Sequence, residues 1–155
     1  MKKDAVLSPC RKYRYALRRI WDDSKKRVMF VGLNPSYADE NKDDQTIKRC
    51  ISYAKQWGYG GVIMGNLFAF RTPSPAEMMK ADQPVGKENE KWLKRLSKEA
   101  DLVVGIWGNS GAFLGRAAEV AAMCPELHCL RINISGQPHH TRNLPDGIKA
   151  IPYNR

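Results

Sequence analysis

The sequence predicts an α/β fold in which helices cover both faces of a central, mostly parallel four-stranded sheet, giving three layers. Four segments share one pattern, in which a short apolar run ends in a cluster of polar residues: residues 28–36, 61–71, 101–110 and 127–144. Segments with helical periodicity separate these runs, and strands that alternate with helices are typical of parallel sheets buried on both faces. A chain of 155 residues is long enough for one hydrophobic core and too short for two. We therefore expect a single domain over residues 1–155.

The first element, residues 13–21, is either a strand or a short helix. Tyr13, Tyr15 and Leu17 alternate with polar residues, and the alternation is then lost. We favour an antiparallel edge strand, joined by the turn-rich residues 22–26 to a buried strand at residues 27–33. A helix is expected next, because apolar residues recur at helical spacing over residues 43–57: Ile47, Cys50, Ile51, Ala54 and Trp57.

The ends of the expected helix at residues 43–57 have suitable residues. Asp43 and Asp44 match its positive amino terminus, and Gly58 suits its end. Three more helices are expected after the second buried strand, over residues 75–80, 86–99 and 110–123. The inward face of the last one is expected to comprise Phe113, Leu114, Ala117, Val120 and Ala121. The fourth strand follows Pro125, and the tail after Leu144 is short and poorly patterned.

Composition limits the class of protein and its partners. The 26 Lys and Arg outnumber the 16 Asp and Glu, for a net charge of +10, and the basic residues are denser toward the amino terminus. Such a chain attracts polyanions, although charge also serves solubility. No apolar run approaches the roughly 18–20 residues of a membrane span, and the first ten residues lack the apolar region of a secretory signal. We expect a cytoplasmic monomer that contacts nucleic acid and no membrane.

Metal and cofactor sites are not expected. The four cysteines form no CxxC pair, and no group of His, Cys, Asp and Glu has the spacing of metal ligands. Buried thiols in a reducing compartment are the better interpretation. The pair His139-His140 is half of a metal site at most, and His128 lies inside an expected strand.

Polar residues follow each of the four apolar runs. In an open α/β sheet, ligands bind outside the carboxyl ends of the strands, so these residues are expected to meet in one crevice. They are Asn34, Ser36, Asn66, Arg71, Asn109, His139 and His140. Gly32 would let a ligand approach the backbone, and Pro35 would stiffen the turn that carries Asn34.

Each of these motifs also has a structural interpretation. Residues 32–36 are compatible with a simple turn, and Asn66 with an amide that caps the sheet edge. Trp107 and Asn109 are compatible with packing and with the N-cap of the next helix, and His139-His140 with a surface loop. As a functional residue, Asn66 would offer a donor and an acceptor together, which is what reading the edge of a pyrimidine requires.

The combination of motifs closely resembles a bacterial and phage family, domain of unknown function 1643, from about Ser8 to Leu144. The motifs that carry the resemblance are the segments at residues 13–17 (YRYAL), 33–36 (LNPS), 44–50 (DQTIKRC), 57–61 (WGYGG), 66–71 (NLFAFR) and 136–140 (GQPHH).

More distantly, the chain resembles the uracil-DNA glycosylase superfamily. Gly32-Leu33-Asn34-Pro35 matches its water-activating Gly-x-Asp/Asn-Pro motif, and residues 62–66 (VIMGN) match its strand that ends in Asn. Residues 103–108 (VVGIWG) match its strand ending in LWG, and His140-Thr141 stands where it has a His-Pro-Ser loop. The late loop departs from that pattern, as does Asn34, which replaces the Asp of the fastest members.

This second resemblance implies roles for particular residues. Asn34 would position the water, Asn66 would bind the flipped base, and His140 would stabilise negative charge on the departing base. Ser36 stands where the uracil-specific branch has a bulky Tyr, which implies space at C5 of the base. Contacts to nucleic acid would come from Arg71, Asn109, His139 and Arg142, around a base-binding pocket that includes Gly32 and Pro35.

The chemistry of N-glycosidic hydrolysis suits these residue types. The reaction builds positive charge on the sugar and negative charge on the leaving base, so preorganised donors and a held water are sufficient. An amide is not basic, so Asn34 can orient a water but not deprotonate it. Asp39 and Asp44 are candidate acids, or simply acids at the start of a helix.

The sequence thus predicts a DNA glycosylase-like enzyme acting on uracil or a modified pyrimidine, in repair or modified-base processing, by flipping the base out of the duplex. A catalytically silent nucleic-acid-binding module, and an enzyme acting on free nucleosides or nucleotides, are the alternatives.

Overall fold

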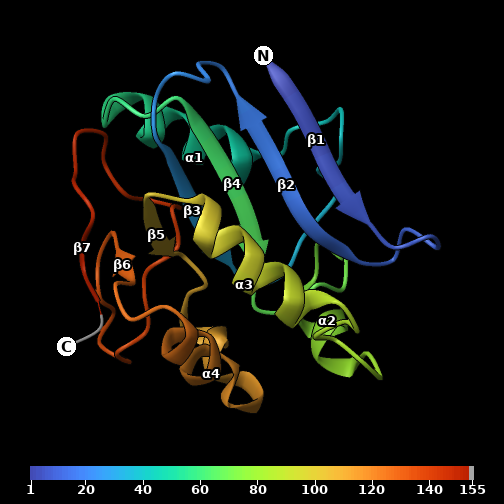
Figure 1. Ribbon diagram of the computed structural model, residues 1–155. Helices are drawn as coiled ribbons and strands as arrows, with labels where there is room; N and C mark the ends of the chain where they lie inside the picture. The colour runs from blue at the N-terminus through green and yellow to red at the C-terminus, as the bar shows by residue number, and fades with distance from the viewer. Residues whose placement is uncertain (154–155) are drawn as a thin grey trace.

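The computed structural model describes residues 1–153 and contains seven strands, four α-helices and one 3-10 helix. In chain order the elements are β1 (Lys2–Leu7), β2 (Arg14–Ile20), β3 (Arg27–Gly32), α1 (Gln45–Gln56), β4 (Gly61–Asn66), α2 (Pro75–Lys80), α3 (Asn89–Glu99), β5 (Leu102–Gly105), η1 (Asn109–Gly115), α4 (Arg116–Met123), β6 (His128–Cys129) and β7 (Ile151–Pro152). The expected α/β class is confirmed. Figure 1 shows α1 behind the sheet and α3 in front of it.

All seven strands belong to one sheet, in the order β1-β2-β4-β3-β5-β6-β7. The inner strands β4, β3, β5 and β6 pair in parallel, so their carboxyl ends share one edge of the sheet. The pairings β1–β2, β2–β4 and β6–β7 are antiparallel. The prediction of a mostly parallel four-stranded sheet is therefore wrong for the sheet as a whole, which is mixed and wider.

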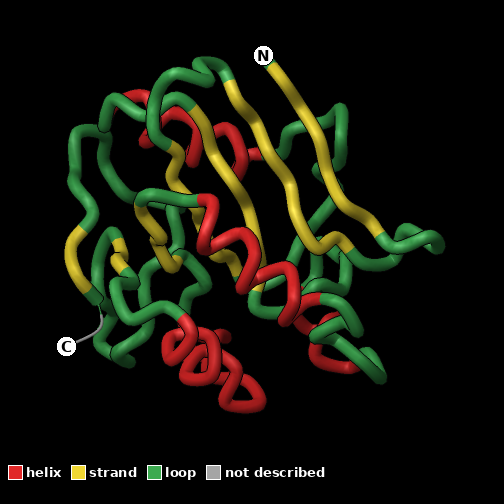
Figure 2. Tube along the Cα trace, viewed as in Figure 1, coloured by secondary structure: helices red, strands yellow, loops and turns green. Residues whose placement is uncertain are grey.

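The predicted edge strand is a strand but not an edge. β2 is flanked by β4 on one side and by β1 on the other, and β1 was not predicted. The first residues of β1 are exposed, so its sequence shows no clean apolar alternation. Its pairing rests on backbone hydrogen bonds, which leave little trace in the residue types. β7 was missed for the same reason, because it is short and exposed. It lies in the carboxyl-terminal third of the chain, which is mostly loop (Figure 2).

The core has two halves, one on each face of the sheet. Because side chains of a strand point alternately to opposite faces, Val28 and Phe30 of β3 pack toward α1, while Met29 and Val31 pack toward α3. All four side chains are buried. Burial on both faces explains why the strand sequence is a continuous apolar run rather than an alternating one.

The predicted helix at residues 110–123 is two elements. η1 ends in a break at Phe113 and at Leu114, whose φ of 55° is left-handed, and α4 starts only at Arg116. Leu114 was expected to face inward, but it is 64 % exposed. Gly115, also at positive φ, lies directly before α4, so the chain turns here. Helical periodicity across a turn of this kind is coincidental.

The other helices differ from expectation only at their ends. α2 has the predicted bounds, with Ser74 as its N-cap, while α1 and α3 each start two or three residues later than expected. In α1 the N-cap is Asp44, whose Oδ1 accepts a hydrogen bond from the backbone N–H of Ile47 at 2.9 Å. No helix within residues 1–153 has the length and apolar character to cross a lipid bilayer.

Candidate functional site

A cavity of about 410 Å³ opens at the carboxyl ends of β3, β4 and β5. Its lining includes nine of the twelve residues that the sequence singled out: Gly32, Asn34, Pro35, Ser36, Asp44, Asn66, Asn109, His140 and Arg142. The site residues therefore converge in space although they span more than a hundred positions of the chain. Asp39, Arg71 and His139 do not line this cavity.

The side chain of Asn34 is held in one orientation by backbone carbonyls. Its Nδ2 donates to the carbonyl oxygen of Thr72 at 2.8 Å, with longer contacts to those of Pro35 and Phe70 at 3.2 and 3.4 Å. These acceptors distinguish the nitrogen from the oxygen of the amide. The Oδ1 accepts no hydrogen bond from residues 1–153, so Asn34 offers the cavity a fixed acceptor that could hold a water.

Asn66, the last residue of β4, is 4 % exposed and fixed in the opposite sense. Its Oδ1 accepts a hydrogen bond from Nη2 of Arg14 at 3.3 Å, which leaves Nδ2 as a donor. Gly32 makes room for this nitrogen, because a Cβ at position 32 would lie 2.8 Å from it. Asn66 and Asn34 thus present opposite polarities: one amide offers a donor and the other an acceptor.

His140 is a neutral imidazole. Its Nδ1 accepts a hydrogen bond from the backbone N–H of Arg142 at 2.9 Å, so the ring proton resides on Nε2. Burial lowers the pKa of His140 below its ordinary value, and the nearby Arg142 and His139 lower it further. The cavity therefore contains a second donor, an Nε2–H that carries no net charge at neutral pH.

The amino terminus of α1 forms another wall, through Gln45, Thr46 and the N-cap Asp44. Among the described residues that line the cavity, Asp44 is the single acid, and one of its oxygens is used by the cap. Asp39 has a local role instead. Its Oδ1 accepts from the backbone N–H groups of Asn41 and Lys42, and these bonds hold the pKa of Asp39 below its usual value.

Arg71 braces two loops. Its guanidinium donates to the carbonyl oxygens of Ser36, Tyr37 and Arg11, at 3.1 to 3.4 Å. The guanidinium of Arg71, which was expected to contact nucleic acid, is therefore already engaged in hydrogen bonds within the protein. His139 is similarly engaged, because its Nδ1 contacts the carbonyl oxygen of His140.

Asn109 and Arg142 lie at the mouth of the cavity and both are exposed. The Oδ1 of Asn109 accepts from Nδ2 of Asn133 and from Oγ of Ser135, so its side chain ties η1 to the loop after β6. Arg142 forms no salt bridge with residues 1–153. Among residues 1–153, it is the one exposed arginine that lines the cavity.

The reasoning from sequence missed several lining residues, and two of them, Arg14 and Tyr37, could contact a ligand through a charge or a ring. Tyr37 is 58 % exposed at the mouth, where an aromatic ring could stack on a planar ligand. Arg14 is 3 % exposed, and its place beside the apolar residues Tyr15, Ala16 and Leu17 was the available signal. That signal was ambiguous, since β2 was expected at a sheet edge, where arginines face solvent.

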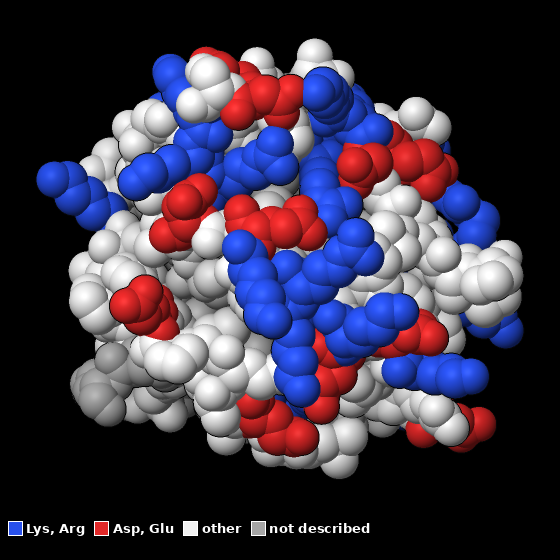
Figure 3. Space-filling model, viewed as in Figure 1, with Lys and Arg blue, Asp and Glu red and all other residues white. Residues whose placement is uncertain are grey.

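Basic side chains also lie outside the cavity, over α3. Figure 3 shows Lys and Arg side chains over the middle of the face that α3 occupies, with acids among them. The groove there is lined by Arg18, Glu90, Lys91, Lys94, Arg95, Lys98 and Glu99. α3 begins at Asn89, whose Nδ2 donates to the carbonyl oxygen of Asn66, so this basic face starts beside the site.

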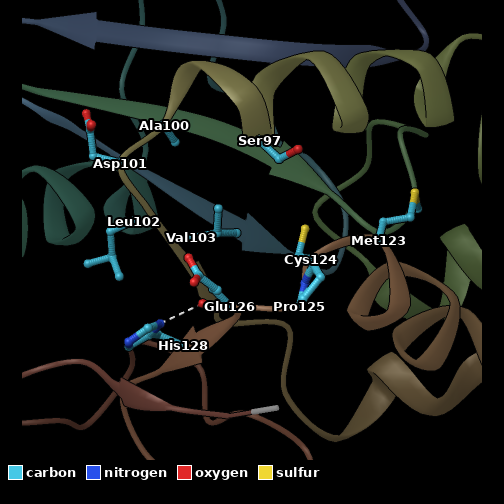
Figure 4. Close-up of a pocket in the computed structure, with 10 residues that line it drawn as sticks. All are labelled: Ser97, Ala100, Asp101, Leu102, Val103, Met123, Cys124, Pro125, Glu126 and His128. Carbon is cyan, nitrogen blue, oxygen red and sulfur yellow. Dashed lines mark hydrogen bonds between the residues drawn. The ribbon is translucent and has the colours of Figure 1, made fainter.

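A second cavity, of about 400 Å³, lies near the amino ends of β5 and β6 (Figure 4). Cys124, Pro125 and Glu126 line it from one side and Leu102 and Val103 from another. None of the twelve residues of the predicted site lines it. Ligands of parallel sheets bind at the opposite, carboxyl ends of the strands, so the first cavity is the better candidate site.

A comparison with protein families finds a match that covers most of the chain. The family is described as a protein of unknown function (DUF1643), and its model matches residues 14–141. No curated protein matches the chain. No solved structure matches it. The matched segment begins at Arg14 and ends at Thr141, so it contains the strands and loops that build the cavity, and the chain belongs to the DUF1643 family.

Proposed function

We propose that this protein hydrolyses the N-glycosidic bond of a pyrimidine nucleotide in DNA. One observation carries the proposal: three neutral side chains of fixed orientation line one cavity, with an acceptor at Asn34 Oδ1 and donors at Asn66 Nδ2 and His140 Nε2. The distant resemblance to uracil-DNA glycosylases supports the same reaction class.

The reaction requires this mixture of polarities. As the bond between the sugar and the base breaks, positive charge develops on the sugar and negative charge on the base. A water held at Asn34 Oδ1 would be placed to attack the sugar carbon. Donors at Asn66 and His140 would stabilise the base as its charge grows, without having to reorganise.

The basic face over α3 and the exposed Arg142 would bind phosphates. Such contacts position a nucleic acid and supply affinity that is independent of sequence. The target base has to leave the stack to enter a cavity, and Tyr37 at the mouth offers a ring against which a base could stack.

A catalytically silent nucleic-acid-binding module is the second candidate. The observation that favours it is the shortage of bases: Asp44 is the single acid among the described lining residues, and its cap bond to α1 restrains it. A module of this kind would bind a flipped base in the same cavity and release nothing.

The test is base release. The protein is incubated with oligonucleotides that carry a panel of normal and modified pyrimidines, and alkali-labile abasic sites are scored on a gel. We expect strand breaks for at least one pyrimidine, and their loss in the His140→Ala variant. Binding to every oligonucleotide without breaks would support the silent module, while release from free nucleosides alone would indicate a small-molecule enzyme.

A further inference from the structure

Arg14 is a buried cation with no counter-ion in contact. The residue is 3 % exposed, yet no carboxylate among residues 1–153 lies within salt-bridge distance of it. Its Nη1 donates to the carbonyl oxygen of Ala38 at 3.1 Å and its Nη2 to Oδ1 of Asn66 at 3.3 Å. The Nε is buried without a hydrogen-bond partner. Burying an unpaired charge is costly, so the arrangement calls for an explanation.

The guanidinium nevertheless stays charged at neutral pH. Burial lowers the pKa of Arg14 to about 10, while Asp44 opposes that shift from a distance. Because Arg14 lines the cavity together with the neutral amides and imidazole, it supplies the positive potential of the cavity floor. A low-dielectric setting makes that potential stronger than it would be in water.

Arg14 also sets the orientation of Asn66. Its Nη2 occupies the amide oxygen, so Asn66 presents Nδ2 beside the Cα of Gly32. The floor of the cavity therefore consists of a cation and a donor, and a ligand atom that meets it should accept hydrogen bonds and carry negative charge.

We propose that Arg14 and Asn66 form a binding floor for an anionic pyrimidine, with Arg14 as the electrostatic and positioning residue. This inference rests on the proposed function for the identity of the ligand. In that reaction the bond from the sugar carbon to the base nitrogen breaks and leaves its electron pair on the base. The water oxygen bonds to the sugar carbon, one water proton passes to solvent, and the base anion later takes a proton from solvent.

The experiment compares a neutral with an anionic free base at neutral pH. Uracil is neutral there, whereas the electron-withdrawing nitro group of 5-nitrouracil leaves that base largely ionised. Isothermal titration calorimetry of both bases gives a preference for each protein variant. We expect the wild type to favour 5-nitrouracil, and the Arg14→Gln variant to lose about tenfold to hundredfold of its affinity for the anion, as for a hydrogen bond to a charged group.

Arg116 provides a matched control. It is 2 % exposed and also has a buried guanidinium nitrogen without a partner, but it does not line the cavity. Arg116→Gln should therefore keep the preference of the wild type. If Arg116→Gln loses the preference as fully as Arg14→Gln does, the effect belongs to general stability and the inference fails.

Asn66→Asp guards against a variant that does not fold. A carboxylate at position 66 would pair with Arg14, cancel the charge of the floor and remove the donor, while the thermal midpoint is kept or raised. We expect the anion preference to disappear in this folded variant. Equal binding of both bases by the wild type, or no binding of either, would overturn the inference.

The anion-binding experiment and the base-release experiment can succeed or fail independently of each other. A preference for 5-nitrouracil that depends on Arg14, without base release from any oligonucleotide, keeps the anion site and refutes the hydrolase. Base release by a protein that shows no such preference refutes the anion site and keeps the hydrolase.

Discussion

Two arginines of strand β2, five residues apart, are buried in opposite ways. Arg19 is fully buried, and its five N–H donors have five acceptors: Oδ1 of Asp43 and the carbonyl oxygens of Asp4, Arg18, Asp39 and Lys42. Arg14 is nearly as buried, but it has two hydrogen bonds and an orphaned Nε. Arg19 joins β2 to the loop before α1, and all its N–H groups are hydrogen-bonded. Arg14 lines a cavity and has N–H groups that make no hydrogen bond.

The difference teaches how to separate structural from functional polar groups in this molecule. Complete hydrogen bonding, as at Arg19, lowers the free-energy cost of burying the charge, so a structural role is sufficient to explain that residue. Incomplete hydrogen bonding beside a cavity is repeated at Asn34 Oδ1, Asn66 Nδ2 and His140 Nε2. Several groups with open hydrogen-bonding capacity thus line the cavity, although Asn89 Oδ1 and Arg116 Nη2 are also buried without a partner outside its lining. We expect substitutions of the groups at the cavity to affect function more than stability.

The largest effect on stability is expected from replacing Arg19, the arginine whose N–H groups are all hydrogen-bonded. Arg19→Gln should lower the free energy of unfolding by about 3–5 kcal/mol, because it breaks a buried ion pair and orphans several carbonyl groups. Arg14→Gln should change it by less than about 1 kcal/mol, because the lost hydrogen bonds are offset by removing an unpaired buried charge. Urea denaturation of both variants measures the difference in their free energies of unfolding. Equal losses in the two variants would contradict the distinction between the two arginines.

The open groups should control rate rather than stability. Asn34→Ala and His140→Ala should each reduce base release about a hundredfold, the usual effect of losing one transition-state partner worth about 3 kcal/mol. DNA affinity should stay close to that of the wild type in a filter-binding assay. Variants that lose binding and activity in parallel would assign these residues to affinity instead.

Asn34→Asp sharpens the assignment of the amide. A carboxylate there would face the carbonyl oxygens that now accept from Nδ2, above all that of Thr72 at 2.8 Å. We expect a loss of about 1–3 kcal/mol in the free energy of unfolding, since buried acceptors would lose their donor. Thermal denaturation checks this. An unchanged midpoint would mean that the side chain rotates and that its orientation is not fixed.

Gly32→Ala tests the space that the backbone leaves for Asn66. The new Cβ would meet Nδ2 at 2.8 Å, so the amide has to shift. We expect a cost of about 1–3 kcal/mol in the free energy of unfolding, the range for overpacking, together with weaker binding of the base. Titration with free pyrimidine bases measures the second effect. Full affinity in this variant would show that the position of Asn66 is unimportant.

Phosphate contacts should appear as salt dependence. Replacing the exposed Arg142 with Gln should weaken binding to all DNA sequences alike and reduce the slope of log affinity against log salt by about one. The equivalent change at Arg71 should act through the loops that it braces, and so should lower stability. A large loss of slope without destabilisation at Arg71 would contradict that distinction.

The smallest effect is expected from pH. Burial lowers the pKa of His140 in the folded state, so the unfolded chain takes up a proton first as pH falls. The stability linked to His140 is therefore complete above the unfolded value of about 6.5 and is lost as pH falls through the folded value. Comparing thermal midpoints of the wild type and His140→Gln from pH 7 to 5 measures this loss. Parallel curves would show that His140 is protonated equally in both states.

The sequence predicted most of the framework because apolar periodicity carries it. The continuous run around Val28 and Phe30 predicted a strand buried on both faces, and Asp44 predicted the start of α1 to within a residue or two. β1 was missed because its pairing uses backbone groups, and the turn at Leu114 was missed because a left-handed residue leaves no periodic signal.

The sequence by itself also predicted that polar residues such as Asn34 and Asn66 would meet, since the carboxyl ends of parallel strands share one edge of the sheet. Only the tertiary structure decided what each could offer. The acceptor of Asn66 is taken by Arg14, the donor of Asn34 by Thr72, and the guanidinium of Arg71 by three carbonyls. The physical reason is that residues distant in sequence donate or accept the hydrogen bonds of these side chains. The order of residues in the sequence does not show which polar atoms are left without a partner.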